Sequence, residues 1–449
     1  MNAAEKLLQE REAAAASQAR KQLTQLLDEG SFEEFDTLMS SNGHRAEVIT
    51  GCGTVYGESV YVFAQDSSVD DGAMGAVQAA KIAKVYDMAE KTGAPVIGIF
   101  DSKGAHVAEG LKALNAFSGL LYASNRLSGV VPQIAVINGV CAGSAAVLAS
   151  VSDLIIMTEE SQLFLTPPYN SEKGNDGSAQ AAAANGTAHI IKKDIAQALE
   201  CTRNILTMLP DNNLAPVMTA ETVIPAPKDC VCSMILDGDS DVELFSAFGS
   251  DVKTALARIN GIACGIVGCH SDSGLLDAAA CTKMTRFVRL CDAFSIPVIT
   301  LVDAIAFAEN DGSELKQAAM LSQAYSEATT AKVAIITKRA YGSAYVALCG
   351  KAANADVVFA LPEATVSAMQ PQAAVTVLMS DRLSAGESRD ALVEEYLATE
   401  ASALNAAMQG CIDDVVTLDE LRDKVTAALG VLSSKRVLTV ARKHSNMPL

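Results

Sequence analysis

The sequence predicts an α/β protein made of two similar domains in tandem, and three observations lead to this prediction. The first is an internal repeat, since residues 81–84, 94–101 and 136–145 recur at 283–286, 296–303 and 335–344. The second is the alternation of short apolar runs with helical stretches in each half. The third is the size and composition: 449 residues, 50% hydrophobic and without Trp. A repeat this long indicates a duplicated domain and not a solenoid.

The order of elements is the same in both halves. In the first half we expect a helical segment over 1–40, strands near 59–63, 95–100, 133–138 and 153–157, and a helix over 111–127. In the second half we expect strands at 297–302, 332–337 and 356–360 and a helix near 313–328. Repeated strand–helix–strand units predict parallel or mixed sheets covered by helices. The expected domains are 1–40, 41–222 and 223–449.

Two segments fall outside the repeat. Residues 167–187 are polar and Gly-rich, then Ala-rich, and are long enough to be a functional loop or lid. Residues 210–227 carry four prolines and are typical of a linker between the halves.

Charge and cysteine content exclude some classes of protein. The net charge of −19 and the pI of about 4.7 argue against a nucleic-acid or anionic-membrane surface. Residues 127–151 are uncharged, but Pro132, Asn138 and Gly139 favour strand, turn and buried helix over a membrane span. Eleven cysteines in mostly apolar runs, with no signal-like N-terminus, predict a reducing, cytoplasmic location.

The repeated turn at the end of a strand has the residues of an oxyanion site. Small residues there leave helix N–H groups unpaired and let a carbonyl oxygen approach. The candidates are Gly143 and Ser144 in one half and Ser343 and Ala344 in the other. Two such sites indicate a reaction in which two carbonyl oxygens gain charge. A tight turn that needs small residues only for packing would give the same pattern.

Longer motifs resemble the biotin-dependent carboxyltransferases, the family of propionyl-CoA carboxylase β subunits and acyl-CoA decarboxylase subunits. The similarity runs nearly end to end. The motifs that carry it lie at 26–32, 53–57, 93–98 with Asp101 and Ser102, 132–134, 141–143, 265–268, 286–294, 340–345, 412–416 and 444–449.

The resemblance implies that each half is a crotonase-like domain. It implies carboxyl transfer between carboxybiotin and the α-carbon of a short-chain acyl-CoA, through an enolate. Gly143 and Ser144 would hold the thioester oxygen, and Ser343 and Ala344 the ureido oxygen of biotin. The positions implied for substrate are Lys103, Gly104, Ala105, His106, Cys141, Ala142, Tyr345 and Val346, and those for biotin are Tyr341, Gly342 and Phe307. Coenzyme A is part of the substrate, and we expect no metal.

The chain departs from the family pattern at several of these positions. Lys103 and His106 stand in a segment that is usually Gly-Gly-Ala-Arg, and residues 304–307 replace a Pro-Gly-Phe. Val346 stands where propionyl enzymes carry Asp, and Ser144 where Gly is usual. The acyl group is therefore left open.

Other residues allow both a functional and a structural interpretation. His106 could orient substrate or lie at the surface, and His189 could line the pocket or serve as a structural partner. Lys81, Lys84 and Lys91 could meet CoA phosphates or form the solvated face of a helix. Cys230, Cys232 and His270 lack the spacing of a zinc site. Ser144 and Ser343 lack the setting of an acyl nucleophile.

The partners follow from motifs that the sequence lacks. It has no phosphate loop for ATP and no biotinylation tetrapeptide, so biotin is expected on a separate carrier protein. A biotin carboxylase subunit or a decarboxylase membrane subunit would be the further partner. The resemblance implies a homo-oligomer, a dimer or trimer of dimers. The alternatives are the α subunit of a sodium-pumping decarboxylase and a non-catalytic scaffold, with a hydratase less favoured.

Overall fold

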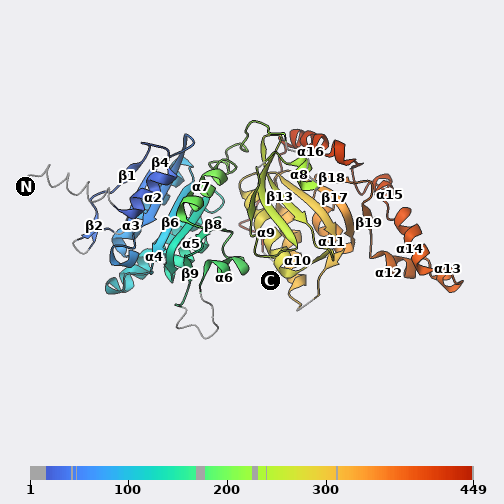
Figure 1. Ribbon diagram of the computed structural model, residues 1–449, viewed down its shortest axis with the longest axis horizontal. Coiled ribbons are helices and arrows are strands. Elements are labelled where there is room, and N and C mark those ends of the chain that lie inside the picture. The colour runs from blue at the N-terminus through green and yellow to red at the C-terminus, as the bar shows by residue number, and fades with distance from the viewer. Residues whose placement is uncertain are drawn as a thin grey trace, which may run out of the picture. The chain divides into compact units, whose positions relative to one another are not determined.

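The structure of the protein, a computed structural model, describes residues 17–41, 44–46, 48–167, 177–224, 231–238, 240–309 and 312–446. The chain forms two compact units, Met1–Pro216 and Val217–Leu449. Each unit contains one large sheet with helices packed on it (Figure 1).

The sheet of the first unit is mixed. Its order is β1-β4-β5-β6-β7-β8-β10, with β9 paired to the end of β7. The strands are β1 (Glu33–Phe35), β4 (Val48–Val55), β5 (Glu58–Gln65), β6 (Val96–Ser102), β7 (Gln133–Ala142), β8 (Leu154–Thr158), β9 (Gln162–Phe164) and β10 (Ile190–Lys192). A separate pair consists of β2 (Ser40–Ser41) and β3 (His44–Arg45). Strands β1, β4 and β5 pair antiparallel, whereas β5 to β8 and β10 are parallel.

Helices cover both faces of this sheet. One face carries α2 (Gln18–Leu26) and α7 (Ile195–Leu206), and the other carries α3 (Ala76–Thr92), α4 (Leu111–Leu127) and α5 (Ser144–Ser150). The remaining elements are α6 (Ala179–Ala184) and the short 3-10 helices η1 (Asp70–Gly72) and η2 (Val107–Glu109).

The second unit repeats this arrangement, with the order β11-β12-β13-β15-β17-β18-β20 and β19 paired to the end of β17. Its strands are β11 (Val242–Leu244), β12 (Val252–Ile259), β13 (Ile262–Cys269), β15 (Val298–Ala304), β17 (Lys332–Tyr341), β18 (Val357–Ala360), β19 (Thr365–Ser367) and β20 (Asp414–Val415), with β14 (Leu275–Leu276) and β16 (Ala306–Phe307) as a separate pair. Helices α9 (Ala278–Ala293), α10 (Glu314–Glu327) and α11 (Gly342–Cys349) form one layer. Helices α8 (Val231–Ile235) and α16 (Leu418–Leu432) pack together beside the sheet.

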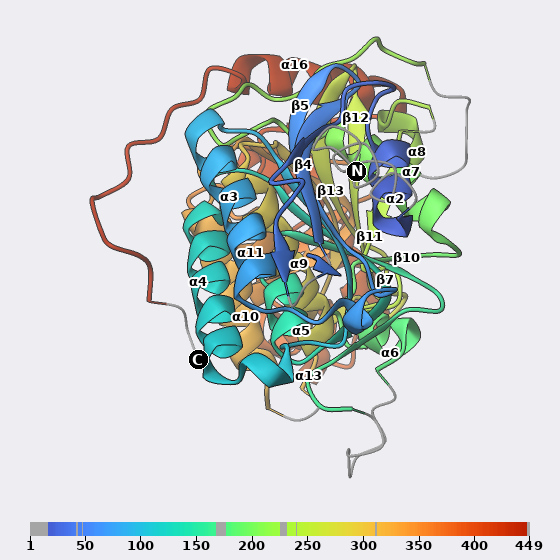
Figure 2. The same cartoon turned by 90° about the vertical axis from the view of Figure 1, so that its left-hand side faces the viewer.

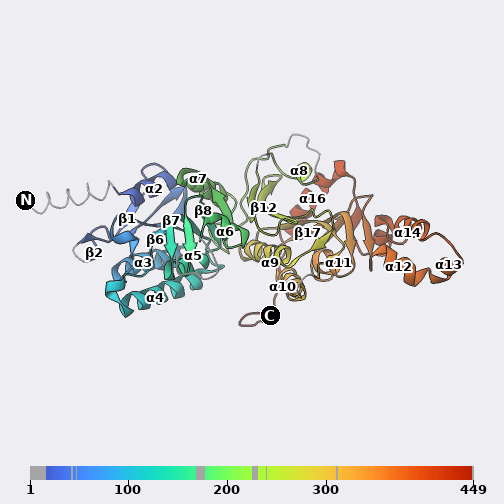
Figure 3. The same cartoon turned by 60° about the horizontal axis from the view of Figure 1, so that its bottom comes forward.

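A small helical lobe distinguishes the second unit from the first. It consists of α12 (Pro371–Leu378), α13 (Ser380–Ser384) and α14 (Arg389–Ala398), followed by α15 (Ala403–Met408). Figure 3 shows α12, α13 and α14 extending beyond the sheet of this unit. The lobe has its own core, formed by Ala374, Val375, Leu392, Tyr396 and Ala401.

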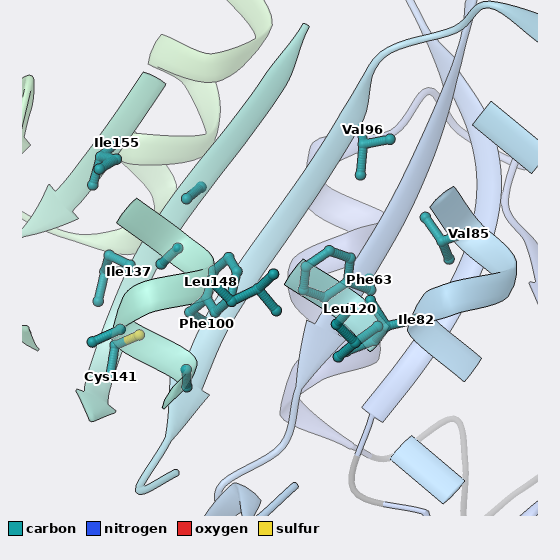
Figure 4. Packing of buried hydrophobic residues seen from close by; sticks show 14 of the residues in the cluster. Phe63, Ile82, Val85, Val96, Phe100, Leu120, Ile137, Cys141, Leu148 and Ile155 are labelled. Carbon is teal, nitrogen blue, oxygen red and sulfur yellow. The ribbon is translucent and has the colours of Figure 1, made fainter. Parts of the chain in front are cut away.

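The core of the first unit lies between its sheet and the α3–α4 layer (Figure 4). The rings of Phe63 and Phe100 meet edge to face, with centroids 5.3 Å apart. Gly98 makes room for this contact, because a Cβ at that position would lie 2.3 Å from the Phe63 ring. A side chain there would therefore displace the centre of the core.

The same ionic contact stabilises the first hairpin of both units. The Asp28 carboxylate accepts hydrogen bonds from the backbone N–H groups of Tyr56 and Gly57 (3.1 and 2.8 Å) and from Arg203 (2.9 Å). In the second unit Asp237 accepts from Asn260 and Gly261 (2.9 and 2.7 Å) and from Arg422 (2.5 Å). Each turn has two residues with positive φ, the geometry that suits a two-residue hairpin loop.

Some elements differ from the sequence-based expectation. Residues 1–16 of the expected helical segment 1–40 lie outside the described residues. Within its described part, 17–40, Gln18–Leu26 is helical, whereas Glu33–Phe35 joins the sheet as β1. Strands β7 and β17 run four residues beyond the predicted ends at 138 and 337, because β9 and β19 pair with these extensions. The described residues also do not include 168–176 of the expected loop, 225–230 of the expected linker and the terminal 447–449.

Candidate active site

The turn after β7 leaves backbone N–H groups unpaired at the start of α5. Gly143 has a φ of +58°, which lets the strand turn sharply into α5. The Gly143 N–H donates to the Phe164 carbonyl at 3.0 Å and so is not available to a ligand. Ser144 begins α5, and no described residue accepts a hydrogen bond from its N–H. Of the two expected donors, Gly143 and Ser144, the Gly143 N–H is thus already paired within the fold, and the Ser144 N–H is the one left unpaired among the described residues.

A second donor lies next to this turn, on the segment after β6. Met74 pairs with this segment, donating to the Gly104 carbonyl at 2.9 Å and accepting from the His106 N–H at 2.8 Å. Successive N–H groups of an extended chain point to opposite sides, so the Ala105 N–H points away from Met74. No described residue accepts from it. Gly104 lies against the turn, because a Cβ there would be 3.1 Å from the Ala142 carbonyl oxygen.

The second unit repeats both donors. Phe307 pairs with Leu276 as Ala105 pairs with Met74, and the Ala308 N–H donates to the Leu276 carbonyl at 2.8 Å. Gly342 has a φ of +50°, like Gly143, and helix α11 packs against β16. In this register Ser343 takes the place of Ser144. The positions of the second unit that correspond to Ala105 and Ser144 are therefore Phe307 and Ser343.

A cavity of about 760 Å³ opens at the second of these turns. Four of the expected site residues line it: Gly342, Ser343, Tyr345 and Val346. The opposite wall comes from the helical lobe and the residues after it, namely Leu378, Met379, Tyr396, Glu400, Asn405, Ala406, Gln409 and Cys411. None of these wall residues was expected from the sequence. The signal in the sequence is the helical stretch over 371–408 between β19 and β20, which is longer than the described helix α6 between β9 and β10.

Tyrosine hydroxyl groups hold the wall of the cavity in place. Tyr345 donates to the Cys411 carbonyl at 2.9 Å, and burial raises the pKa of its phenol to about 12. The Tyr396 hydroxyl pairs with Ser367 at 3.0 Å. Tyr341, expected at the biotin site, is buried, and its hydroxyl pairs with Thr365 at 2.8 Å, so its side chain supports β19.

The remaining expected residues of the first unit have structural contacts. Lys103 forms a solvent-exposed ion pair with Asp71 at 2.7 Å. Cys141 and Ala142 are buried in β7, and burial raises the pKa of the Cys141 thiol. His106 is half-buried at the start of η2. These side chains shape the segment around Ala105 and Ser144.

Two alternatives from the sequence are decided by burial. Lys81 is fully buried and donates to the Val48 carbonyl at 2.7 Å, so it neither meets CoA phosphates nor forms a solvated face. Lys84 and Lys91 form surface ion pairs with Asp36 and Asp87. His189 is buried, and its Nδ1 accepts a hydrogen bond from the Ile155 N–H at 2.8 Å, which is a structural role.

Two absences can be stated for the part of the chain that the structure describes. There, no group of three or more His, Cys, Asp or Glu side chains is arranged to hold a metal ion. No helix in those ranges is both long and apolar enough to cross a membrane.

Comparison with known proteins decides the family. A family model described as the carboxyl transferase domain matches residues 12–447. The chain belongs to this carboxyltransferase family. The expected family, the two tandem crotonase-like domains and the enzyme class of carboxyl transfer are thereby confirmed.

The similar carboxyltransferases include two kinds of enzyme subunit. The chain is 34% identical to the methylmalonyl-CoA decarboxylase subunit alpha of Propionigenium modestum, over 99% of this chain and 95% of the relative. It is 35% identical to the propionyl-CoA carboxylase carboxyltransferase subunit of Haloferax mediterranei, over 96% and 93%. The solved transcarboxylase 12S, a hexamer with methylmalonyl-CoA and methylmalonic acid bound, superimposes with a TM-score of 0.91 at 32% identity, covering 98% of this chain and 94% of that one.

Proposed function

We propose that this carboxyltransferase moves a carboxyl group between biotin on a separate carrier protein and the α-carbon of a short-chain acyl-CoA. The observation that carries the proposal is the repeated pair of backbone donors, Ala105 with Ser144 and Phe307 with Ser343. Residues 41–222 form the acyl-CoA side and residues 223–449 the biotin side.

The first pair of donors acts on the thioester. Its two N–H groups are fixed by the β6 and β7 ends, so they need not reorganise when negative charge develops on the thioester oxygen. Loss of the α-proton places that charge there, and the pair stabilises the resulting enolate. Removal of one such donor typically lowers the rate by about 100-fold to 1000-fold.

The second pair and the cavity suit biotin. The apolar wall at Val346, Leu378 and Met379 can cover the hydrocarbon part of a bicyclic ring, and the Ser343 N–H can donate to a ureido oxygen. A volume of about 760 Å³ is within the range of small-molecule sites. When bound, biotin supplies the nitrogen that carries the carboxyl group. The chain's own residues hold the ring, exclude water and neutralise the oxygen.

The partners, the oligomeric state and the location belong to the same proposal. The relatives are subunits of carboxylases and decarboxylases, so we infer a biotin carrier protein and either a biotin carboxylase or a membrane decarboxylase subunit as partners. We infer a homo-oligomer, a dimer or a trimer of dimers. We place the protein in the cytoplasm, consistent with its mostly buried free thiols.

Labelled carboxyl transfer tests this function. Malonyl-CoA and methylmalonyl-CoA, each labelled in the free carboxyl group, are incubated with free biotin or the biotinylated carrier protein and the purified enzyme. Ser144→Pro removes the N–H at the first helical position, where Pro is tolerated, and Ser144→Ala keeps it. We expect transfer in wild type and Ser144→Ala and a loss of at least 100-fold in Ser144→Pro. Bound CoA ester without transfer in any of these proteins would favour a scaffold instead.

A further inference from the structure

One arginine of the second unit links two segments beside the proposed biotin site. Arg339 lies in the extension of β17, and its guanidinium donates from Nε and Nη2 to the two carboxylate oxygens of Asp303, at 2.6 and 3.0 Å. Nη2 also donates to the Asp272 carbonyl at 3.3 Å. Asp303 lies in β15, and Asp272 lies in the loop between β13 and β14. A single side chain thus connects the end of β15 to that loop.

The two linked segments continue into the strand pair that carries Phe307. The Ile305 N–H donates to the Gly274 carbonyl at 2.8 Å. Strand β14 then pairs with β16, with Leu276 opposite Phe307. A Cβ on Gly274 would lie 3.0 Å from Nη2 of Arg339 and 3.2 Å from the Ile305 side chain. The guanidinium therefore lies against the first hydrogen bond of this pair.

The ion pair of Arg339 and Asp303 is stiff and largely shielded from water. The Asp303 side chain is 5% exposed and that of Arg339 30% exposed. A guanidinium that bonds both oxygens of a carboxylate fixes orientation as well as distance. The pairing of β15 with β17 is irregular between Val302 and Ala304. The side-chain contact therefore supplements the backbone pairing at the point where β15 ends.

The first unit fastens the equivalent loop in another way. Val140 takes the place of Arg339, and Lys103 takes the place of Ile305. Lys103 forms its ion pair with Asp71, whose side chain is about as exposed as its own, so water weakens the attraction. Ile305 can form no ion pair. The second unit has the half-buried arginine instead, attached from the neighbouring strand.

We propose that Arg339 is a positioning residue for carboxyl transfer. It fixes the loop and the end of β15, and through them the direction of the Phe307 N–H, one of the two donors assigned to the biotin oxygen. The inference rests on the function proposed above and adds a residue that does not line the cavity. Misplacement of a group by about 1 Å can lower a rate by about 100-fold. The loss falls mainly on the rate, because the oxygen gains its charge during the reaction.

Matched lysine substitutions test this role. Arg339→Lys keeps a charge beside Asp303 but cannot reproduce the planar fork that also reaches the Asp272 carbonyl. Arg422→Lys is the control, because Arg422 makes the same kind of contact with Asp237 at the opposite end of β13. Figure 2 shows β13 beside β12, the strand with which it forms the turn at that end.

Transfer to free biotin is measured at saturating methylmalonyl-CoA, and equilibrium titration with acyl-CoA counts the folded sites. We expect kcat per site to fall by about tenfold or more in Arg339→Lys, with a smaller change in the KM for biotin. Arg422→Lys should match wild type. Gly274→Ala places a methyl group against the guanidinium without removing it, and should lower kcat in the same way.

The outcomes separate this inference from the function on which it rests. A wild-type kcat in Arg339→Lys overturns the positioning role of Arg339, and so does an equal fall in Arg422→Lys. Acyl-CoA affinity that falls together with kcat would also overturn it, because it would mean a general loss of structure. No transfer in wild type would reject the proposed function, and the inference with it.

Discussion

Arg339 holds Asp303 by two hydrogen bonds, from Nε at 2.6 Å and from Nη2 at 3.0 Å. The equivalent carboxylate of the first unit, Asp101, has no such partner. Val140 takes the place of Arg339, and Asp101 accepts instead from the Val140 N–H at 3.2 Å and from the Ser67 hydroxyl. The two halves thus keep a carboxylate at the same position of the repeat, but only the second half pairs it with an arginine.

This difference predicts opposite responses to the same substitution. Asp303→Asn leaves the half-buried Arg339 without its partner, so we expect the free energy of unfolding to fall by about 2 kcal/mol. Burial raises the pKa of Asp101, so its charge opposes folding at neutral pH. Asp101→Asn is therefore expected to be neutral or stabilising. Urea unfolding of the two variants at pH 7 checks this, and equal losses in both would contradict it.

The second donor pair predicts a separation between binding and transfer. Ser343→Pro removes the N–H proposed for the ureido oxygen, and Ser343→Ala keeps it. We expect Ser343→Pro to lower carboxyl transfer to free biotin by at least 100-fold and to leave acyl-CoA affinity unchanged. Steady-state rates measure the carboxyl transfer, and equilibrium titration with acyl-CoA measures the affinity. Transfer lost to the same degree in Ser343→Ala would point to the hydroxyl group and not to the backbone.

Acid should weaken the first unit through Asp28. The Gly57 N–H is the largest cause that lowers the pKa of this carboxyl to about 2, with Arg203 adding to it. Since the folded pKa lies below the unfolded value of 3.8, the stabilisation is present above about pH 4 and is lost as the pH falls toward 2. Water screens the ion pair of Asp28 and Arg203, which is partly exposed. We therefore expect the Asp28 charge to contribute about 1 kcal/mol to the free energy of unfolding.

Unfolding of wild type and Asp28→Asn at pH 3 and pH 6 measures this contribution. The variant should be less stable at pH 6, and the difference should shrink at pH 3. A difference that does not depend on pH would mean that the lost hydrogen bonds, and not the charge, are responsible.

Alkali should weaken both units through their buried thiols. Burial raises the pKa of Cys269 and Cys281 to about 12 and that of Cys141, Cys264 and Cys349 further. Because the pKa values of these thiols are higher in the folded than in the unfolded chain, their stabilisation of the fold is complete below about pH 9. It is lost as the pH rises above that value. We expect the free energy of unfolding in reducing buffer to fall between pH 9 and pH 11. We expect this fall in the free energy of unfolding to be smaller in Cys264→Val. A fall as large as in wild type would contradict the assignment of the effect to the buried thiols.

The repeated segments predicted the order of elements well, because short apolar runs and helix-forming stretches are local features. The helix at Leu111–Leu127 begins and ends where the sequence indicated. The ends of β7 and β17 were missed because β9 and β19, which extend them, come 20 residues or more later in the chain. Hydrogen bonds between distant segments leave no local signal.

The positions of the two turns could be predicted from the sequence, but not which of their N–H groups are unpaired. The small residues at 143–144 and 342–344 marked the turns, but which N–H is free depends on a carbonyl from another strand, that of Phe164. The resemblance implied Ala105 as a substrate position and Phe307 as a biotin position. The side to which their backbone N–H groups point follows only from the pairing of these residues with Met74 and Leu276.

The sequence by itself determined the duplication, the α/β class, the family and the position of both turns, since all of these depend on residue type and spacing along the chain. Only the tertiary structure decided which backbone donors are unpaired, that Lys81 is buried, and that the helical lobe closes a cavity over Ser343 and Val346. These facts depend on contacts between residues far apart in the chain. A residue's type limits such contacts, but only packing determines which of them form.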